Sequence, residues 1–97
     1  MVKHVIIWKL KEGIDQAAVK AAIKRELEGL VGKIEGLQEM KILTERYDCS
    51  AGDLLMDSSF ESKAALDAYQ AHPAHQKIAN ELVRPNAEAR LSFDYEV

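Results

Sequence analysis

The chain opens with a segment in which every second residue falls on the same side. One side of residues 2–10 carries Val2, His4, Ile6, Trp8 and Leu10, and the other carries Lys3, Val5, Ile7 and Lys9. A period of two is typical of a β-strand. Because both sides are apolar at their centres, we expect this strand to lie in the middle of its sheet.

A helical period follows. Asp15 is a good N-cap residue, and the apolar positions after it recur at spacings of 4, 4, 3 and 4, at Val19, Ile23, Leu27, Leu30 and Ile34. This spacing places them on one face of a helix. The pattern predicts an amphipathic helix that begins after Asp15 and ends at Gly36.

The rest of the chain divides into shorter elements. Strands are predicted at residues 37–45, 53–60 and 88–97, with a loop at residues 47–52 between the first two. Ser62 can cap a short helix, and Pro73 suits the first position of a further helix that residues 84–86 close. In the last strand Leu91, Phe93, Tyr95 and Val97 alternate with Arg90, Ser92, Asp94 and Glu96.

The resulting order is βαββαβ, which is the ferredoxin-like pattern of an α+β protein. It places both helical segments on one face of a four-stranded antiparallel sheet and leaves the other face bare. The apolar row of the last strand would then be exposed to water. We therefore expect a homodimer in which two sheet faces cover each other.

Length, charge and cysteine content exclude several classes of protein. A chain of 97 residues supports one domain, residues 1–97, and its 13 basic and 16 acidic residues give a net charge of −3. The interleaved charges argue against a nucleic-acid partner, and no apolar run approaches the length of a membrane span. With no leader-like segment, we expect a cytoplasmic protein. Cys49 is the single cysteine, so no internal disulfide can form.

The histidines are the main candidates for chemistry. His72 and His75 have the spacing of half a metal site, but the spacing supplies no third ligand, so neither a metal nor another cofactor is expected. We interpret His72 as a helix-capping residue. His75 lies in the first turn of the predicted helix, where the partial positive charge favours a neutral ring that can act as a base.

Three further residues could complete a site around His75. Asp94 is expected to point toward the helices and to orient the His75 ring, while Tyr69 adds a phenol and His4 a second imidazole. The alternative is a buried polar network that satisfies its own hydrogen bonds and fixes the register of the strands.

The segment His72-Pro73-Ala74-His75, preceded by Tyr69, resembles the signature of the stress-responsive A/B barrel domain family, often called Dabb. The opening residues 2–6 and the closing residues 93–95 are similar to the first and last strands of that family. The resemblance implies a small dimeric α+β barrel. By motif position it also carries over the catalytic roles of plant polyketide cyclases of the olivetolic acid cyclase type, which need no cofactor, onto His75, Asp94, Tyr69 and His4.

Three functions remain open at this point. The first is binding of a small hydrophobic or aromatic ligand between sheet and helices. The second is a cofactor-free enzyme resembling a polyketide cyclase or an isomerase, in which His75, oriented by Asp94, removes a proton next to a carbonyl group. The third is a cofactor-independent monooxygenase of similar barrel type.

Overall fold

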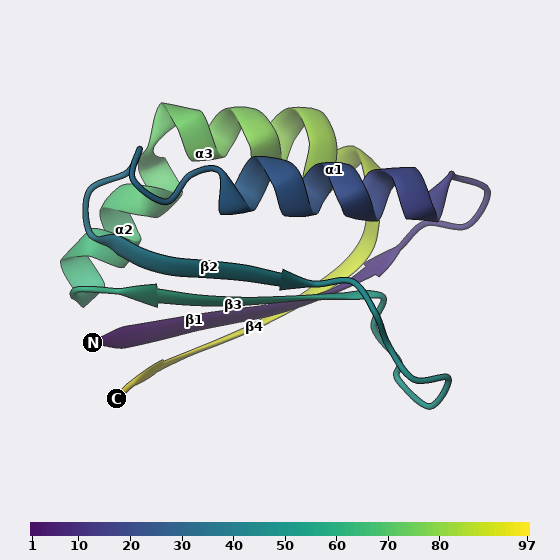
Figure 1. The fold of residues 1–97 in the computed structure, drawn as a ribbon, viewed down its shortest axis with the longest axis horizontal. Helices are drawn as coiled ribbons and strands as arrows, with labels where there is room; N and C mark the ends of the chain where they lie inside the picture. Colours follow the sequence, from purple (N-terminus) through teal and green to yellow (C-terminus); the bar gives the residue numbers. More distant parts are fainter.

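A four-stranded antiparallel sheet forms one layer of the molecule (Figure 1). The computed structural model describes all residues, Met1–Val97. Strand β1 (Val2–Leu10) lies between β3 (Leu54–Phe60) and β4 (Ala87–Glu96), and β2 (Leu37–Leu43) forms the far edge, so the order is β2-β3-β1-β4. The ferredoxin-like pattern and the central position of the first strand are confirmed.

All helices cover the same face of this sheet, as Figure 1 shows. They are α1 (Gln16–Glu28), α2 (Lys63–Ala71) and α3 (Pro73–Ile78), followed by a π-helical turn η1 (Ala79–Val83) and the short α4 (Arg84–Asn86). None of them is long and apolar enough to cross a membrane. The opposite face of the sheet is left without any cover from this chain.

The predicted helix caps are confirmed. The side chains of Asp15 and Ser62 accept hydrogen bonds from the backbone N–H groups of Ala18 and Ala65, both at 3.1 Å. His72 caps α3 in the same way, since its Nδ1 accepts from the N–H of Ala74 at 3.0 Å. Each cap satisfies a backbone donor that the helix itself leaves free.

The end of the first helix differs from the prediction. Helix α1 stops at Glu28, with Gly29 as its C-cap, and residues 29–36 form turns in which Gly32 has a φ of +88°. A residue with positive φ cannot continue a right-handed helix. Leu30 and Ile34 are nevertheless buried. They match the helical spacing because the turn returns them to the same core, not because they belong to the helix.

The inner face of the sheet and the helices enclose one apolar core. It includes Val2, Ile6, Trp8 and Leu10 of β1, which the sequence pattern had grouped on one side of that strand. The outer face carries the predicted apolar row of β4, in which Leu91 and Phe93 are 72% and 71% exposed. Since Phe93 points outward, its neighbour Asp94 points toward the helix side, as expected.

Candidate functional site

A cavity of about 290 Å³ lies between the helix layer and the inner face of the sheet. Apolar side chains that include Ile6, Trp8, Met56 and Val83 form much of its wall. The remainder is polar and includes His4, Tyr69 and His75. Three of the four site residues predicted from the sequence therefore come together around one space.

Tyr69 lies at the wall of this cavity. It is on α2, is only 1% exposed, and packs its ring against Phe60 and His75 with centroid distances of 5.0 and 4.3 Å. Its hydroxyl group is buried and has no hydrogen-bond partner. Burial raises the pKa of the Tyr69 phenol well above its ordinary value, which keeps the group neutral and able to donate.

His75 is held in place by the turn that Pro73 begins. Its Nδ1 lies 3.3 Å from the carbonyl oxygen of Gln70. A carbonyl oxygen only accepts, so Nδ1 is the donor and Nε2 keeps its lone pair in the neutral ring.

The pKa of His75 is lowered, chiefly by burial, which disfavours the charged ring. The Gln70 carbonyl raises this pKa, whereas Arg84, His4 and Arg90 lower it further. The expected neutral imidazole is therefore supported, but burial rather than the start of the helix is its main cause.

Asp94 forms its hydrogen bond with His4 and not with His75. Its carboxylate accepts a hydrogen bond from Nδ1 of His4, which is 3% exposed, while the Asp94 side chain is 40% exposed. The expected hydrogen bond between His75 and Asp94 is therefore wrong.

The reason is the register of the sheet, because Asp94 of β4 lies directly opposite His4 of β1. Directly opposed residues of an antiparallel pair have neighbouring side chains on the same face. His75, in contrast, belongs to the helix layer and uses a backbone carbonyl of its own segment.

Two arginines of the cavity wall, Arg84 and Arg90, were not among the predicted site residues. Arg84 begins α4, and Arg90 on β4 pairs with Trp8 in the register, so it lies on the helix side of the sheet. The signal was present, since Arg90 had been placed on the same side of the last strand as Asp94. A charged side chain that faces the helix layer is costly unless it is paired, and this holds for Arg90 as well as for Asp94.

The last helical segment is also less regular than predicted. Residues 79–83 form a π-helical turn, and Ala79 and Val83 of this turn line the cavity. Such turns are rare and often occur at functional sites. Apolar spacing does not reveal this turn in the sequence, because the short stripe of Ile78, Ala79, Leu82 and Val83 also fits an ordinary α-helix.

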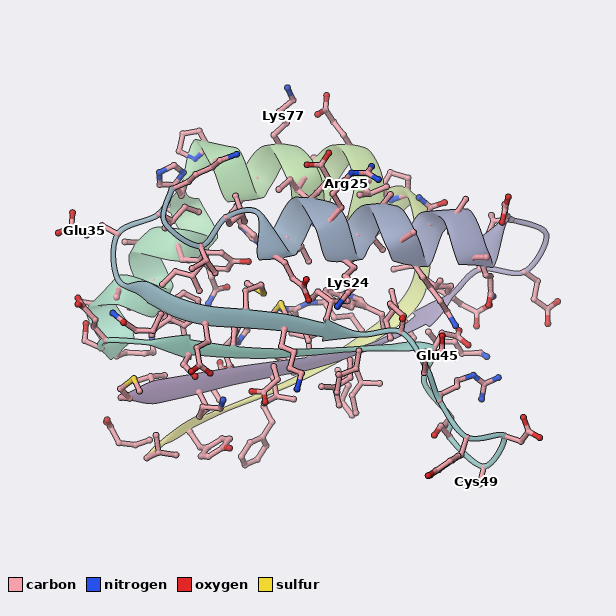
Figure 2. The ribbon with its side chains drawn as sticks, viewed as in Figure 1. Lys24, Arg25, Glu35, Glu45, Cys49 and Lys77 are labelled. Atoms are coloured by element: carbon pink, nitrogen blue, oxygen red, sulfur yellow. The ribbon has the colours of Figure 1, made fainter.

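A metal centre does not assemble here. His72 uses its Nδ1 as a helix cap, and no group of three or more His, Cys, Asp or Glu residues could hold an ion. Cys49 is exposed at the tip of the loop between β2 and β3, away from the cavity (Figure 2).

The arrangement can therefore bind and exchange protons with a small molecule. It offers one neutral phenol as a donor and one neutral imidazole, His75, with a free Nε2. His4, oriented by Asp94, adds a second ring on the opposite wall. Tyr69 and His75 lie side by side in the helix layer, with His4 across from them on the sheet, and a hydrogen-bond donor beside a base is an element of general acid–base chemistry.

Comparison with known families agrees with this architecture. The family model described as "Stress responsive A/B Barrel Domain" (Dabb) matches residues 2–97. The chain is 32% identical over 84 residues to the stress-response A/B barrel domain-containing protein HS1 of Arabidopsis thaliana. That match covers 80% of this chain and 73% of the relative.

Solved structures share the fold over almost the whole chain. A dimeric ferredoxin-like protein from Jannaschia sp. CCS1 is 28% identical with a TM-score of 0.79, over 99% of this chain and 98% of the other. A dimeric protein of ferredoxin-like fold from Bacteroides fragilis reaches a TM-score of 0.90 at 23% identity, over 99% and 95% of the two chains. Both of these similar proteins are dimers.

Proposed function

The chain belongs to the stress-responsive A/B barrel domain family, and we propose that it binds a small, mainly apolar molecule in the cavity between its sheet and its helices. The cavity volume of about 290 Å³ is at the low end of the range of ligand pockets. Trp8 and Met56 provide apolar walls against which a flat ligand can pack.

The hydroxyl group of Tyr69 is the observation that carries this proposal. Tyr69 lines the cavity, and its hydroxyl group is buried and has no hydrogen-bond partner in the protein. Buried polar groups nearly always have a partner, and an unpaired one costs about 1–3 kcal/mol. A ligand with an acceptor atom at this point would supply the missing bond. Water is the competing occupant.

A cavity-filling variant tests the proposal. Ala79 is buried in η1 and faces the cavity, so Ala79→Leu reduces the space available. We expect small aromatic compounds to raise the melting temperature of the wild type by mass action and to have much less effect on Ala79→Leu. Thermal-shift measurements with a panel of phenols and aromatic acids and amides provide the readout.

The matched control adds the same side chain on the opposite side of the helix layer. Lys77 of α3 points away from the sheet, as Figure 2 shows, so Lys77→Leu should keep the ligand response of the wild type. A panel that stabilises neither protein would leave water as the occupant and overturn the proposal. An equal response of Ala79→Leu would place the ligand elsewhere and overturn it as well.

A second candidate function is proton transfer without a cofactor. The observation in its favour is the pair of imidazoles on the cavity wall beside a neutral phenol. Nε2 of His75 would take a proton from a carbon next to a carbonyl group, and Tyr69 would donate a hydrogen bond to the enolate oxygen that forms. Asp94 orients His4 in this version, instead of the base.

Hydrogen–deuterium exchange tests this candidate directly. We expect the wild type in D₂O to exchange the methyl protons of acetophenone faster than buffer does, and His75→Gln to abolish the excess rate. NMR follows both reactions. Exchange that is equal in wild type and His75→Gln would reject His75 as the base and leave the binding proposal intact. No residue of the cavity favours the monooxygenase alternative, and we do not propose it.

We also propose that a second copy of the chain covers the outer face of the sheet. The support is the exposed apolar row of β4, which continues onto the half-exposed Ile7 of β1. Exposed apolar faces of this kind commonly mark protein interfaces. The dimeric state of the similar proteins from Jannaschia and Bacteroides points the same way.

A further inference from the structure

The polar groups of the cavity are not distributed evenly. Arg84 and Arg90 line it from α4 and β4, where the helix layer ends and the sheet edge begins. Both side chains are exposed, whereas Tyr69 is 1% exposed. The cavity therefore has two cationic groups at its open side and a single neutral donor in its interior.

Neither arginine is neutralised by the protein. Neither of them forms an ion pair, and the one hydrogen bond that Arg84 donates goes to the neutral amide oxygen of Asn80. Glu88 also lines the cavity but pairs with neither guanidinium. Asp94 accepts a hydrogen bond from His4 and pairs with neither arginine.

The charge balance makes this arrangement unusual for the molecule. The chain has a net charge of −3. Two arginines without an ion pair nevertheless line the same cavity as Tyr69, whose buried hydroxyl group has no partner. Both arginines line the cavity that His75 also lines, and their positive charges add to the lowering of the His75 pKa that burial causes.

We propose that the cavity takes a planar carboxylate, with its ring among Trp8 and Tyr69 and its carboxylate bound by Arg90 with help from Arg84. This inference rests on the proposed binding function and names the chemical class of the ligand. Guanidinium groups match the planar carboxylate with two parallel hydrogen bonds. The buried Tyr69 and the exposed arginines all line the cavity, so a ligand with one acceptor for the phenol and a carboxylate for the guanidinium groups fits them, and 4-hydroxybenzoate has this pattern.

A matched pair of probes separates charge from shape. 4-Hydroxybenzoate and 4-hydroxybenzamide have nearly the same outline, but only the first is an anion. Calorimetric or NMR titration of the wild type should give tighter binding of the carboxylate. Arg90→Gln should weaken the carboxylate roughly tenfold and leave the amide unchanged. Arg84→Gln should have a smaller effect of the same kind.

Arg25→Gln is the control for the change in net charge. Arg25 lies on α1 and points away from the sheet in Figure 2, so its loss should not alter either affinity. Folding of each variant is checked by its melting temperature. Because both cavity arginines are exposed and make no ion pair, their replacement should leave that temperature within a few degrees of the wild type.

The outcomes distinguish this inference from the proposed function on which it rests. Equal affinity for acid and amide, or a carboxylate affinity that survives in both Arg90→Gln and Arg84→Gln, overturns the carboxylate assignment while ligand binding stands. A wild type that binds neither probe overturns the carboxylate assignment, and the thermal-shift panel then decides the binding proposal separately. A selective loss in Arg90→Gln supports the assignment.

Discussion

His4 and Asp94 form a hydrogen bond across the β1–β4 pair, directly opposite each other in the register. The histidine is 3% exposed, and its Nδ1 donates to a carboxylate that is 40% exposed. The bond therefore ties a core residue of the central strand to the edge strand. It also leaves Nε2 as the only ring atom of His4 that a cavity ligand can use as an acceptor.

We expect Asp94→Ala to destabilise the fold by about 1–3 kcal/mol, because it leaves a buried donor of His4 without its partner. Asp94→Asn should recover most of that loss, since an amide oxygen can still accept. Urea denaturation measures both variants.

Ser92→Ala is the matched control on the same face of β4, because Ser92 is exposed and forms no side-chain hydrogen bond to the protein. Its unfolding free energy should stay within about 0.5 kcal/mol of the wild type. Equal stability of Asp94→Ala and Ser92→Ala would show that the bond contributes nothing to folding.

Tyr69→Phe separates a structural hydroxyl group from a functional one. The Tyr69 hydroxyl has no partner in the protein, so its removal should leave the unfolding free energy unchanged or raise it by up to about 1 kcal/mol. Affinity for a phenol or aromatic acid should nevertheless fall by a factor of roughly 3 to 10. Tyr95→Phe, on the outer face, should change neither quantity. A clear loss of stability in Tyr69→Phe would show that the hydroxyl group has a partner within the protein and would contradict its role in ligand binding.

His75 should make the stability depend on pH in a defined direction. Burial lowers its folded-state pKa below the ordinary 6.5, so over the interval between the two values the unfolded chain binds a proton that the folded chain does not. This contribution is complete above about pH 6.5 and is lost as the pH falls toward the lower folded pKa.

The difference in unfolding free energy between wild type and His75→Gln reports this contribution. As the pH falls from about 7.5 to about 5, the unfolding free energy of the wild type should decrease relative to that of His75→Gln. Urea denaturation at each pH measures both. NMR titration of the His75 ring gives the folded pKa independently. A value at or above 6.5 would contradict the role of burial.

Phe93→Glu should yield a monomer if the outer sheet face is the interface between two copies. The wild type should sediment at micromolar concentration with twice the mass of one chain, and the variant with the mass of one chain. A glutamate in the middle of an apolar interface would be buried without a partner. Ser92→Glu, one residue away but on the other face, should remain a dimer. A monomeric wild type would remove the basis of this proposal.

Gly36 lies in the connection between α1 and β2, directly before β2, where there is no room for a side chain. Its φ is +86°, and a Cβ at this position would lie 2.6 Å from Cβ of Ala65 on α2. Gly13 has a similar φ of +77° but no atom within 4 Å of its Cβ position. Gly13→Ala should therefore cost about 1–2 kcal/mol from backbone strain alone.

Gly36→Ala should cost a further 1–3 kcal/mol or so, because Ala65 and the start of α2 must move. Thermal and urea denaturation of the two variants isolate the steric contribution as their difference. Equal losses in both variants would mean that α2 shifts freely at this contact.

The elements and faces of this protein were predictable because they are local properties of the chain. Alternation in residues 2–10 identified the strand and the residues that share each of its faces, and its two apolar faces indicated a central position. Asp15, Ser62 and His72 were predictable as caps since each satisfies a donor within three residues of itself. The end of α1 was missed because Leu30 and Ile34 keep a helical spacing while the backbone already turns at Gly32. A side chain can reach the core from a helix or from a turn, so the burial of Leu30 and Ile34 does not show which of the two the backbone forms.

The sequence by itself determined which residues belong to each face of the sheet, because side chains of a strand alternate whatever the strand pairs with. Only the tertiary structure decided which partner each of them meets. Because of the β1–β4 register, Asp94 forms its hydrogen bond with His4 and not with His75. The packing of the helix layer on the sheet leaves the Tyr69 hydroxyl without a partner and brings Tyr69 and Arg90 to the same cavity. Register and layer spacing are set by packing between residues distant in the chain, which no local pattern records.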